Sequence, residues 1–288
     1  MKLVASSVVS GDRPGSAPGG IYLIDLEGQS VRQAIDTNDG SIQWNGRGRE
    51  VGFRGIACSD NRLYAVASDE LFVYTPTFEL VDSWQNPYLK HCRGISVFER
   101  KLLIASAGFD SIVGFDLDQS RFDWAMHVQR EGAAVGFKRF DPASDDGPIL
   151  LGKLDIRSLW CDETGMYINI DQGLLRFNSK ALTMAVELPP DARDARPYRD
   201  GVLFNDTEAG SLRYSGRGEG DEDRALPLPQ EAGFARGLCQ LNTTVFAAGA
   251  SPAAVTVYDL AANETLLSVQ LSDDERTSIH SIAAWPYD

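Results

Sequence analysis

The chain has 288 residues, of which 43% are hydrophobic and 24% charged, and its formal net charge is −14 at pH 7. This length suffices for one large all-β domain or two ordinary domains, and the composition is that of a soluble globular protein. A surface that binds nucleic acid or anionic lipid needs positive charge, so the acidic balance argues against both as partners.

Short apolar segments, separated by turns rich in Gly, Asp and Asn, follow one another along the chain. Six of them end on an aromatic or Ile followed by a polar residue: 21–26, 71–76, 111–117, 174–179, 211–216 and 255–260. Each is preceded by another apolar segment: 2–9, 62–68, 101–108, 165–170, 201–206 and 244–250. Their alternation and their β-branched and aromatic residues predict strands, and no long segment has a helical period.

A further strand precedes most of these pairs, and its start carries an arginine. The arginine stands nine residues before the first apolar residue of the next strand in Arg54/Leu63, Arg93/Leu102, Arg157/Met166 and Arg236/Val245. In the fifth unit, Arg193 has this spacing to Val202, and Arg196 competes with it for the same position. The spacing favours Arg193, and both residues remain candidates.

The last segment, 279–286, matches these first strands and has His280 in the arginine position. No strand follows it, whereas the chain begins with a second strand that lacks a first. The two ends therefore complete one unit, which predicts a six-bladed β-propeller of four-stranded antiparallel blades over residues 1–288, closed by pairing the N-terminal strands with the C-terminal strand. A long insertion at about 129–155 separates blades three and four, and we expect it to cover a pocket.

This blade pattern resembles the six-bladed propellers of the gluconolactonase/paraoxonase and NHL-repeat type, over nearly the whole chain. The resemblance implies a ligand at the centre of one face, and a metal held by Glu, Asn and Asp near the starts of the innermost strands. Those positions hold mostly arginine here, so we expect no cofactor and no metal, while calcium at oxygen ligands stays open.

If the first strands are innermost, their starts converge on the propeller axis. The converging residues are Arg54, Arg93, Arg157, Arg193 or Arg196, Arg236 and His280. Several guanidinium groups around one cavity require anions, because buried like charges repel and lose hydration. One source is protein carboxylates, of which Asp155 and Asp194 adjoin these starts and Asp110, Asp171 and Asp206 lie in nearby loops. The other source is an anionic ligand, and the two are compatible.

These residues suggest a small-molecule enzyme acting on a carboxylate or phosphate substrate, of the non-redox lyase, isomerase or hydrolase type. The arginines and Asp194 would bind the substrate, and His91 or His280 would move a proton with help from Asp110, Asp155 or Asp194. The alternative is a non-catalytic propeller that binds an anionic metabolite or serves as a protein-interaction scaffold. The sequence gives no indication of oligomeric state.

Four widely separated cysteines form no CxxC pair. We interpret them as buried thiols in a reducing cytoplasm, the location expected for the protein. The N-terminus lacks the apolar stretch of a signal peptide, and no segment approaches the roughly 20 apolar residues of a membrane helix.

Overall fold

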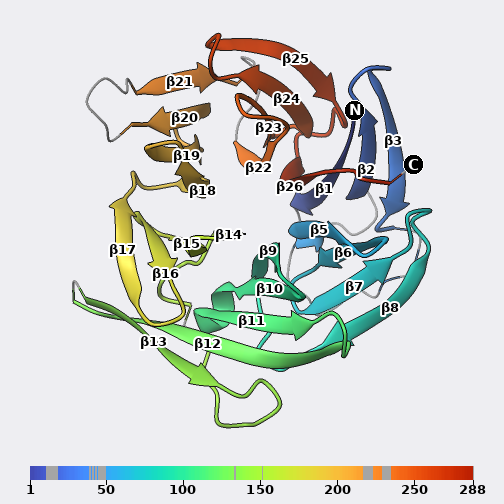
Figure 1. Ribbon diagram of the computed structural model, residues 1–288. Helices are drawn as coiled ribbons and strands as arrows, with labels where there is room; N and C mark the ends of the chain where they lie inside the picture. The colour runs from blue at the N-terminus through green and yellow to red at the C-terminus, as the bar shows by residue number, and fades with distance from the viewer. Residues whose placement is uncertain are drawn as a thin grey trace.

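The protein is a six-bladed β-propeller, as the repeat predicted (Figure 1). The computed structural model describes residues 1–10, 19–38, 40, 42, 44, 50–132, 134–150, 152–216, 223–228 and 235–287. Within these ranges the one helical element is the short 3₁₀ helix η1 (Ala107–Phe109), and none of the described helices is long and apolar enough to span a membrane.

The first three blades are antiparallel sheets that run outward from the axis. Blade one consists of β26 (Thr277–Ala284), β1 (Lys2–Ser10), β2 (Gly20–Asp25) and β3 (Ser30–Asp36), with β4 (Glu50–Gly52) paired to the end of β1. Blade two consists of β5 (Gly55–Ser59), β6 (Arg62–Val66), β7 (Glu70–Tyr74) and β8 (Leu80–Gln85). Blade three consists of β9 (Cys92–Phe98), β10 (Lys101–Ser106), β11 (Ser111–Asp116), β12 (Arg121–Glu131) and β13 (Ala134–Phe140).

The remaining blades each have four strands and follow in chain order. Blade four consists of β14 (Ser158–Asp162), β15 (Gly165–Ile170), β16 (Gly173–Phe177) and β17 (Leu182–Glu187). Blade five consists of β18 (Ala192–Tyr198), β19 (Gly201–Asp206), β20 (Ser211–Ser215) and β21 (Arg224–Pro227). Blade six consists of β22 (Arg236–Gln240), β23 (Val245–Ala250), β24 (Ala254–Asp259) and β25 (Glu264–Gln270).

The two ends of the chain meet in blade one. There β26 pairs antiparallel with β1, in a register that runs from Leu3↔Ala284 to Val9↔Thr277. The innermost strands contact one another in the closed order β5, β9, β14, β18, β22 and β26. Because this ring is closed, the starts of all six inner strands face one axis.

The hydrophobic core lies between the blades rather than at the axis. Six apolar clusters of described residues fill the spaces between neighbouring blades. Between blades one and two, for example, the fully buried Phe53 makes edge contacts with Phe72 and Tyr74 at centroid distances of 5.7 and 6.2 Å. Burying a side chain of this size contributes roughly 2–3 kcal/mol. The blades therefore adhere through their faces, and the main hydrophobic clusters lie away from the axis.

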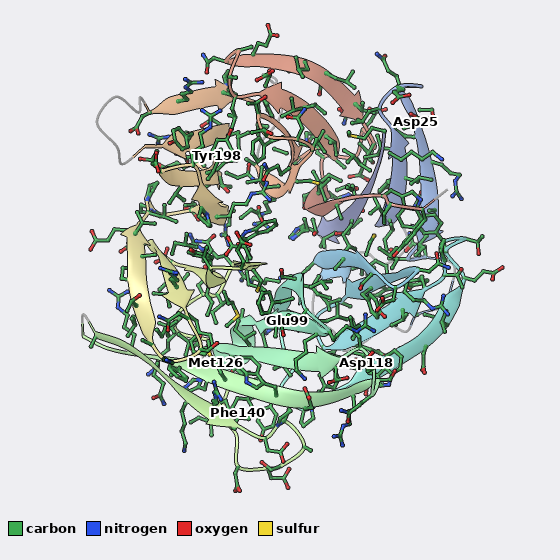
Figure 2. The ribbon with its side chains drawn as sticks, viewed as in Figure 1. Asp25, Glu99, Asp118, Met126, Phe140 and Tyr198 are labelled. Carbon is green, nitrogen blue, oxygen red and sulfur yellow. The ribbon has the colours of Figure 1, made fainter. Side chains whose placement is uncertain are left out.

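The insertion between blades three and four is not a lid over the axis. Its first part extends β12 and adds β13 as an outermost fifth strand, paired from Ala125↔Phe140 to Glu131↔Ala134. Phe140 lies at the outer edge of blade three (Figure 2), where its ring packs edge-on against Tyr88 at 4.8 Å. Phe137 packs on Phe177 of blade four at 4.9 Å. The expected pocket cover is thus wrong for these aromatics, because strand pairing and apolar burial hold them on the outside.

Candidate functional site

The starts of several inner strands contain β-bulges, and these aim side chains at the axis. In β9 the pairing passes from Cys92↔Ser106 to Gly94↔Ala105, so Arg93 is the extra residue. In β26 it passes from Ile279↔Ser7 to Ser281↔Ser6, so His280 is the extra residue. Register shifts also occur in β18 after Arg193 and in β22 after Arg236. An extra residue bends the strand and redirects its side chain, which explains how Arg93 and His280 come to face the axis.

Side chains at the starts of the inner strands line one polar cavity, here named the ring cavity. Its volume is about 190 Å³, and it is lined by Arg54, Arg93, Asp155, Arg157, Arg193, Asp194, Arg236 and His280. Five of these groups are guanidiniums and two are carboxylates. The wall is therefore locally cationic, although the whole chain carries a net charge of −14.

Arg157 is bonded to protein groups through all three of its guanidinium nitrogens. Its Nε donates to Asp155 Oδ2 at 3.0 Å, its Nη2 to Asp171 Oδ1 at 2.8 Å, and its Nη1 to the Ala192 carbonyl at 3.3 Å. Its side chain is only 5% exposed. Protein carboxylates, one of the two anion sources that the sequence suggested, thus compensate the charge of Arg157. Through these bonds Arg157 links blade four to blade five.

Arg93 and Arg193 are less fully bonded. Arg93 Nη1 lies 2.9 Å from Asp155 Oδ1, and its side chain is 30% exposed. Arg193 Nη2 lies 3.5 Å from Asp191 Oδ1. The Nε of each is buried without a hydrogen-bond partner among the described residues. The described protein groups therefore hold these two guanidiniums less firmly than they hold that of Arg157.

Asp155 links two arginines and has a lowered pKa. Desolvation alone would raise the pKa of this carboxyl, but the charge of Arg93 and the hydrogen bond from Arg157 outweigh it. Asp155 is therefore ionised at neutral pH, and it orients Arg93 and Arg157 relative to each other.

A local pattern recurs two residues before three of the arginines. His91, Asp155 and Asp191 precede Arg93, Arg157 and Arg193, and all three have left-handed backbone, with φ of 52°, 48° and 64°. Asp and Asn tolerate this conformation better than most residues. The sequence reasoning missed Asp191, although this spacing, already visible at Asp155 and His91, could have found it.

Asp194, Arg236 and His280 form the other side of the ring cavity. Asp194 Oδ2 accepts hydrogen bonds from the backbone N–H of Gly237 at 2.7 Å and from Asn205 Nδ2 at 3.1 Å. Burial raises the pKa of Asp194, although these two hydrogen bonds oppose the shift. Arg236 Nη1 lies 3.1 Å from His280 Nε2. Desolvation and then the charge of Arg236 hold the pKa of His280 well below its ordinary value, so its imidazole is neutral at pH 7.

The arginines also affect one another. Desolvation, followed by the charges of Arg93 and Arg236, lowers the pKa of Arg54 to about 10. Desolvation, followed by Arg157 and Arg236, lowers the pKa of Arg193 to about 10. Both remain protonated at neutral pH, and their lowered pKa values reflect burial first and the nearby like charges second.

The structure resolves the competition between Arg193 and Arg196. Arg193 lines the ring cavity, as the spacing predicted. Arg196 is 3% exposed and lies farther along β18, where its guanidinium stacks on Trp160 at 4.7 Å and on Phe246 at 5.2 Å. Desolvation lowers the pKa of Arg196 to about 10. Arg196 therefore takes part in packing between blades and does not line the ring cavity.

Two other candidates do not line the ring cavity. Asp110 is 2% exposed, and its carboxylate accepts hydrogen bonds from the N–H groups of Lys153 and Leu154 at 2.7 and 3.0 Å. It fastens the end of the insertion to blade three. His91 is exposed at the rim, and desolvation followed by the charge of Arg54 lowers its pKa. The sequence spacing placed both near the axis, but neither is among the residues that line the ring cavity.

No cluster of three or more His, Cys, Asp or Glu side chains with metal-binding geometry is present among the described residues. The four cysteines form no disulfide. Desolvation raises the pKa of Cys58, Cys92 and Cys161 to about 12, so these thiols stay protonated.

Comparisons with known proteins support the architecture and no particular activity. No family model matches the chain, and no curated protein matches it. A chain from a crystal structure of a nidogen/laminin complex is similar with a TM-score of 0.61 and 10% identity, over 98% of both chains. The computationally designed Ika8 protein is similar with a TM-score of 0.51 and 12% identity, over 96% of both chains. At such identities the likeness shows the propeller fold alone.

Proposed function

We propose that this propeller binds a small anionic molecule, a carboxylate or a phosphate, in the ring cavity. The observation that best supports this proposal is the charge of the cavity wall, which contains five arginines and two aspartates. Asp171 and Asp191 neutralise part of this charge from the rim, chiefly at Arg157. A bound anion would offset the remaining repulsion, and guanidinium groups are well suited to carboxylate and phosphate oxygens.

The position of the cavity also supports this proposal. It lies at the starts of the inner strands, at the centre of one face, where the resemblance to gluconolactonase-type and NHL-repeat propellers implies a ligand. Arg93 and Arg193 would hold the anion, with Arg54 and Arg236 beside them. Arg157 and Asp155 would keep the wall in shape. The unpaired thiols support a cytoplasmic location for this binding protein.

Catalysis on the bound anion, of the non-redox lyase, isomerase or hydrolase type, is a second candidate function. It is favoured by the neutral imidazole of His280 inside the ring cavity, next to the carboxyl of Asp194 with its raised pKa. Groups with shifted pKa values in one cavity are typical of proton-transfer sites. However, the same lowered pKa makes His280 a weak base, so the geometry supports binding better than catalysis.

The test is isothermal titration calorimetry with inorganic phosphate, acetate and small hydroxy-acids, on the wild type and on Arg93→Gln. We expect at least one anion to bind, and the variant to lose about tenfold or more in affinity, because a charged hydrogen bond contributes about 1.5–3 kcal/mol. The matched control is Arg100→Gln, which removes an exposed arginine that pairs with Asp60 and Asp118 on the surface. Equal affinity in all three proteins, or no binding of any anion, would refute the proposal.

A further inference from the structure

A second cavity continues along the axis from the ring cavity, and it is here named the axial channel. Its volume is about 380 Å³. Four residues line both cavities, namely Arg54, Arg93, Asp194 and His280, so the two spaces adjoin at the arginine layer. The two cavities are therefore neighbours along the axis.

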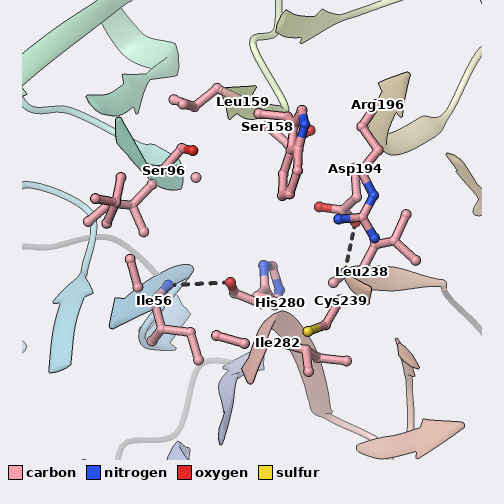
Figure 3. A pocket seen from close by; sticks show the side chains of 18 of the residues that line it. Ile56, Ser96, Ser158, Leu159, Asp194, Arg196, Leu238, Cys239, His280 and Ile282 are labelled. Carbon is pink, nitrogen blue, oxygen red and sulfur yellow. Dashed lines mark hydrogen bonds between the residues drawn. The ribbon is translucent and has the colours of Figure 1, made fainter. Parts of the chain in front are cut away.

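Most side chains that line the axial channel are apolar, and Ser96, Ser158, Gln240 and Ser281 add polar groups to the wall. It consists of the later residues of the inner strands, among them Ile56, Val97, Leu159, Leu238 and Ile282. Figure 3 shows side chains from these strands arranged around an open centre. Cys58 and Cys161 also line the channel, and as protonated thiols they behave as small apolar groups. This wall differs sharply from the ring cavity directly beside it.

Besides Arg54 and Arg93, which it shares with the ring cavity, the channel wall has two charged groups, Arg196 and Asp194, and both interact within the wall itself. The guanidinium of Arg196 has its faces covered by Trp160 and Phe246. Its Nε and Nη2 are buried and have no hydrogen-bond partner among the described residues, so a ligand in the channel does not reach them either. Asp194 is held by Gly237 and Asn205. The channel consequently favours an apolar occupant over a second charged one.

We infer that the molecule bound at the ring cavity is amphiphilic, with its acid group among the arginines and an apolar chain in the axial channel. This inference rests on the proposed function. A preformed apolar space next to a cluster of charged donors fits a ligand that has one anionic end and one hydrophobic end. Each methylene that leaves water for such a wall contributes to affinity through the hydrophobic effect.

The test is a titration of the full-length protein with straight-chain carboxylates of rising length, from acetate through butyrate and hexanoate to octanoate. We expect the affinity to rise roughly three- to fourfold per methylene, which corresponds to about 0.8 kcal/mol per buried group. Inorganic phosphate serves as the anion without a chain.

The variant that isolates the channel is Ser96→Leu. Ser96 lines the axial channel from β9 but not the ring cavity. A leucine there would occupy channel volume, so octanoate should bind about tenfold more weakly, whereas phosphate and acetate should bind as in the wild type. Ser96→Ala, which removes the hydroxyl without adding volume, is the matched control and should bind octanoate normally. The thermal transition of each variant shows whether it is folded.

The outcomes separate this inference from the proposed function. If short anions bind and Arg93→Gln weakens them, but affinity does not depend on chain length, the proposed function stands and the channel inference fails. If octanoate binds equally to the wild type, Arg93→Gln and Ser96→Leu, it adsorbs elsewhere and the inference also fails. If no anion of any length binds, the proposed function fails, and the inference fails with it.

Discussion

At the scale of single residues, arginines in equivalent sequence positions have different roles. Arg157 is 5% exposed and bonds Asp155, Asp171 and a backbone carbonyl, whereas Arg93 is 30% exposed and has an ion pair to Asp155. We expect Arg157→Gln to lower the free energy of unfolding by about 2–3 kcal/mol. This is below the cost of breaking a fully buried pair, because both carboxylates are partly solvated. Urea denaturation monitored by tryptophan fluorescence measures the change.

Arg93→Gln is the comparison for this prediction, since it removes a guanidinium from the same wall. Arg93→Gln should lower the free energy of unfolding by about 1 kcal/mol or less, as for other partly exposed pairs. Losses of equal size, or a larger loss at Arg93, would contradict the division between a structural arginine and a ligand-binding one.

At the scale of elements, Asp110 binds the end of the insertion to blade three through hydrogen bonds to Lys153 and Leu154. It ends η1 in the left-handed conformation, with φ of 47°, and its carboxylate accepts from the N–H groups of Lys153 and Leu154. Asp110→Ala should leave both N–H groups without this partner and strain the backbone, at a cost of about 1–3 kcal/mol. We expect the amides of Lys153 and Leu154 to exchange roughly tenfold faster or more, as measured by hydrogen exchange.

Asp110→Asn is the control, because Asn tolerates the left-handed conformation and keeps one acceptor oxygen. It should accelerate exchange less than the alanine variant does. If neither variant changes exchange at these two amides, Asp110 does not hold the segment.

The geometry of the strands also explains which features of the site the sequence could predict and which it could not. The spacing from Arg193 to Val202 identified the correct arginine, because it reflects the regular hairpin between the first two strands of a blade. The bulges at Arg93 and His280 were not predictable, since an extra residue leaves the alternation of a short strand almost unchanged. For the same reason the sequence could name Asp155 as a neighbour of the arginines but not show which of them it bonds.

At the scale of the whole molecule, the fold was predictable because the repeat constrains every blade at once. Five units follow one another along the chain, and the unpaired strands at its two ends complete a sixth. This pattern indicated a closed ring. The axial channel was not predictable in the same way, since its width depends on how far the inner strands stand from the axis. The outer strand β13 escaped prediction because its pairing with β12 concerns one blade and has no counterpart in the repeat.

Closure through β26 should control the stability of the entire ring. Deletion of residues 277–288 removes the inner strand of blade one, together with Ile279, Ile282 and Trp285, which are 0, 6 and 7% exposed. Burial of three such side chains contributes roughly 5–9 kcal/mol, comparable with the total stability of about 5–15 kcal/mol for many domains. The deletion also opens the edge of β1 to solvent.

We expect the shortened chain to lose its cooperative urea transition, and a synthetic peptide of residues 277–287 to restore it, whereas a scrambled peptide should not. An unchanged midpoint and slope without the peptide would show that five blades and an open edge suffice, and that pairing of the two termini is not what holds the propeller together.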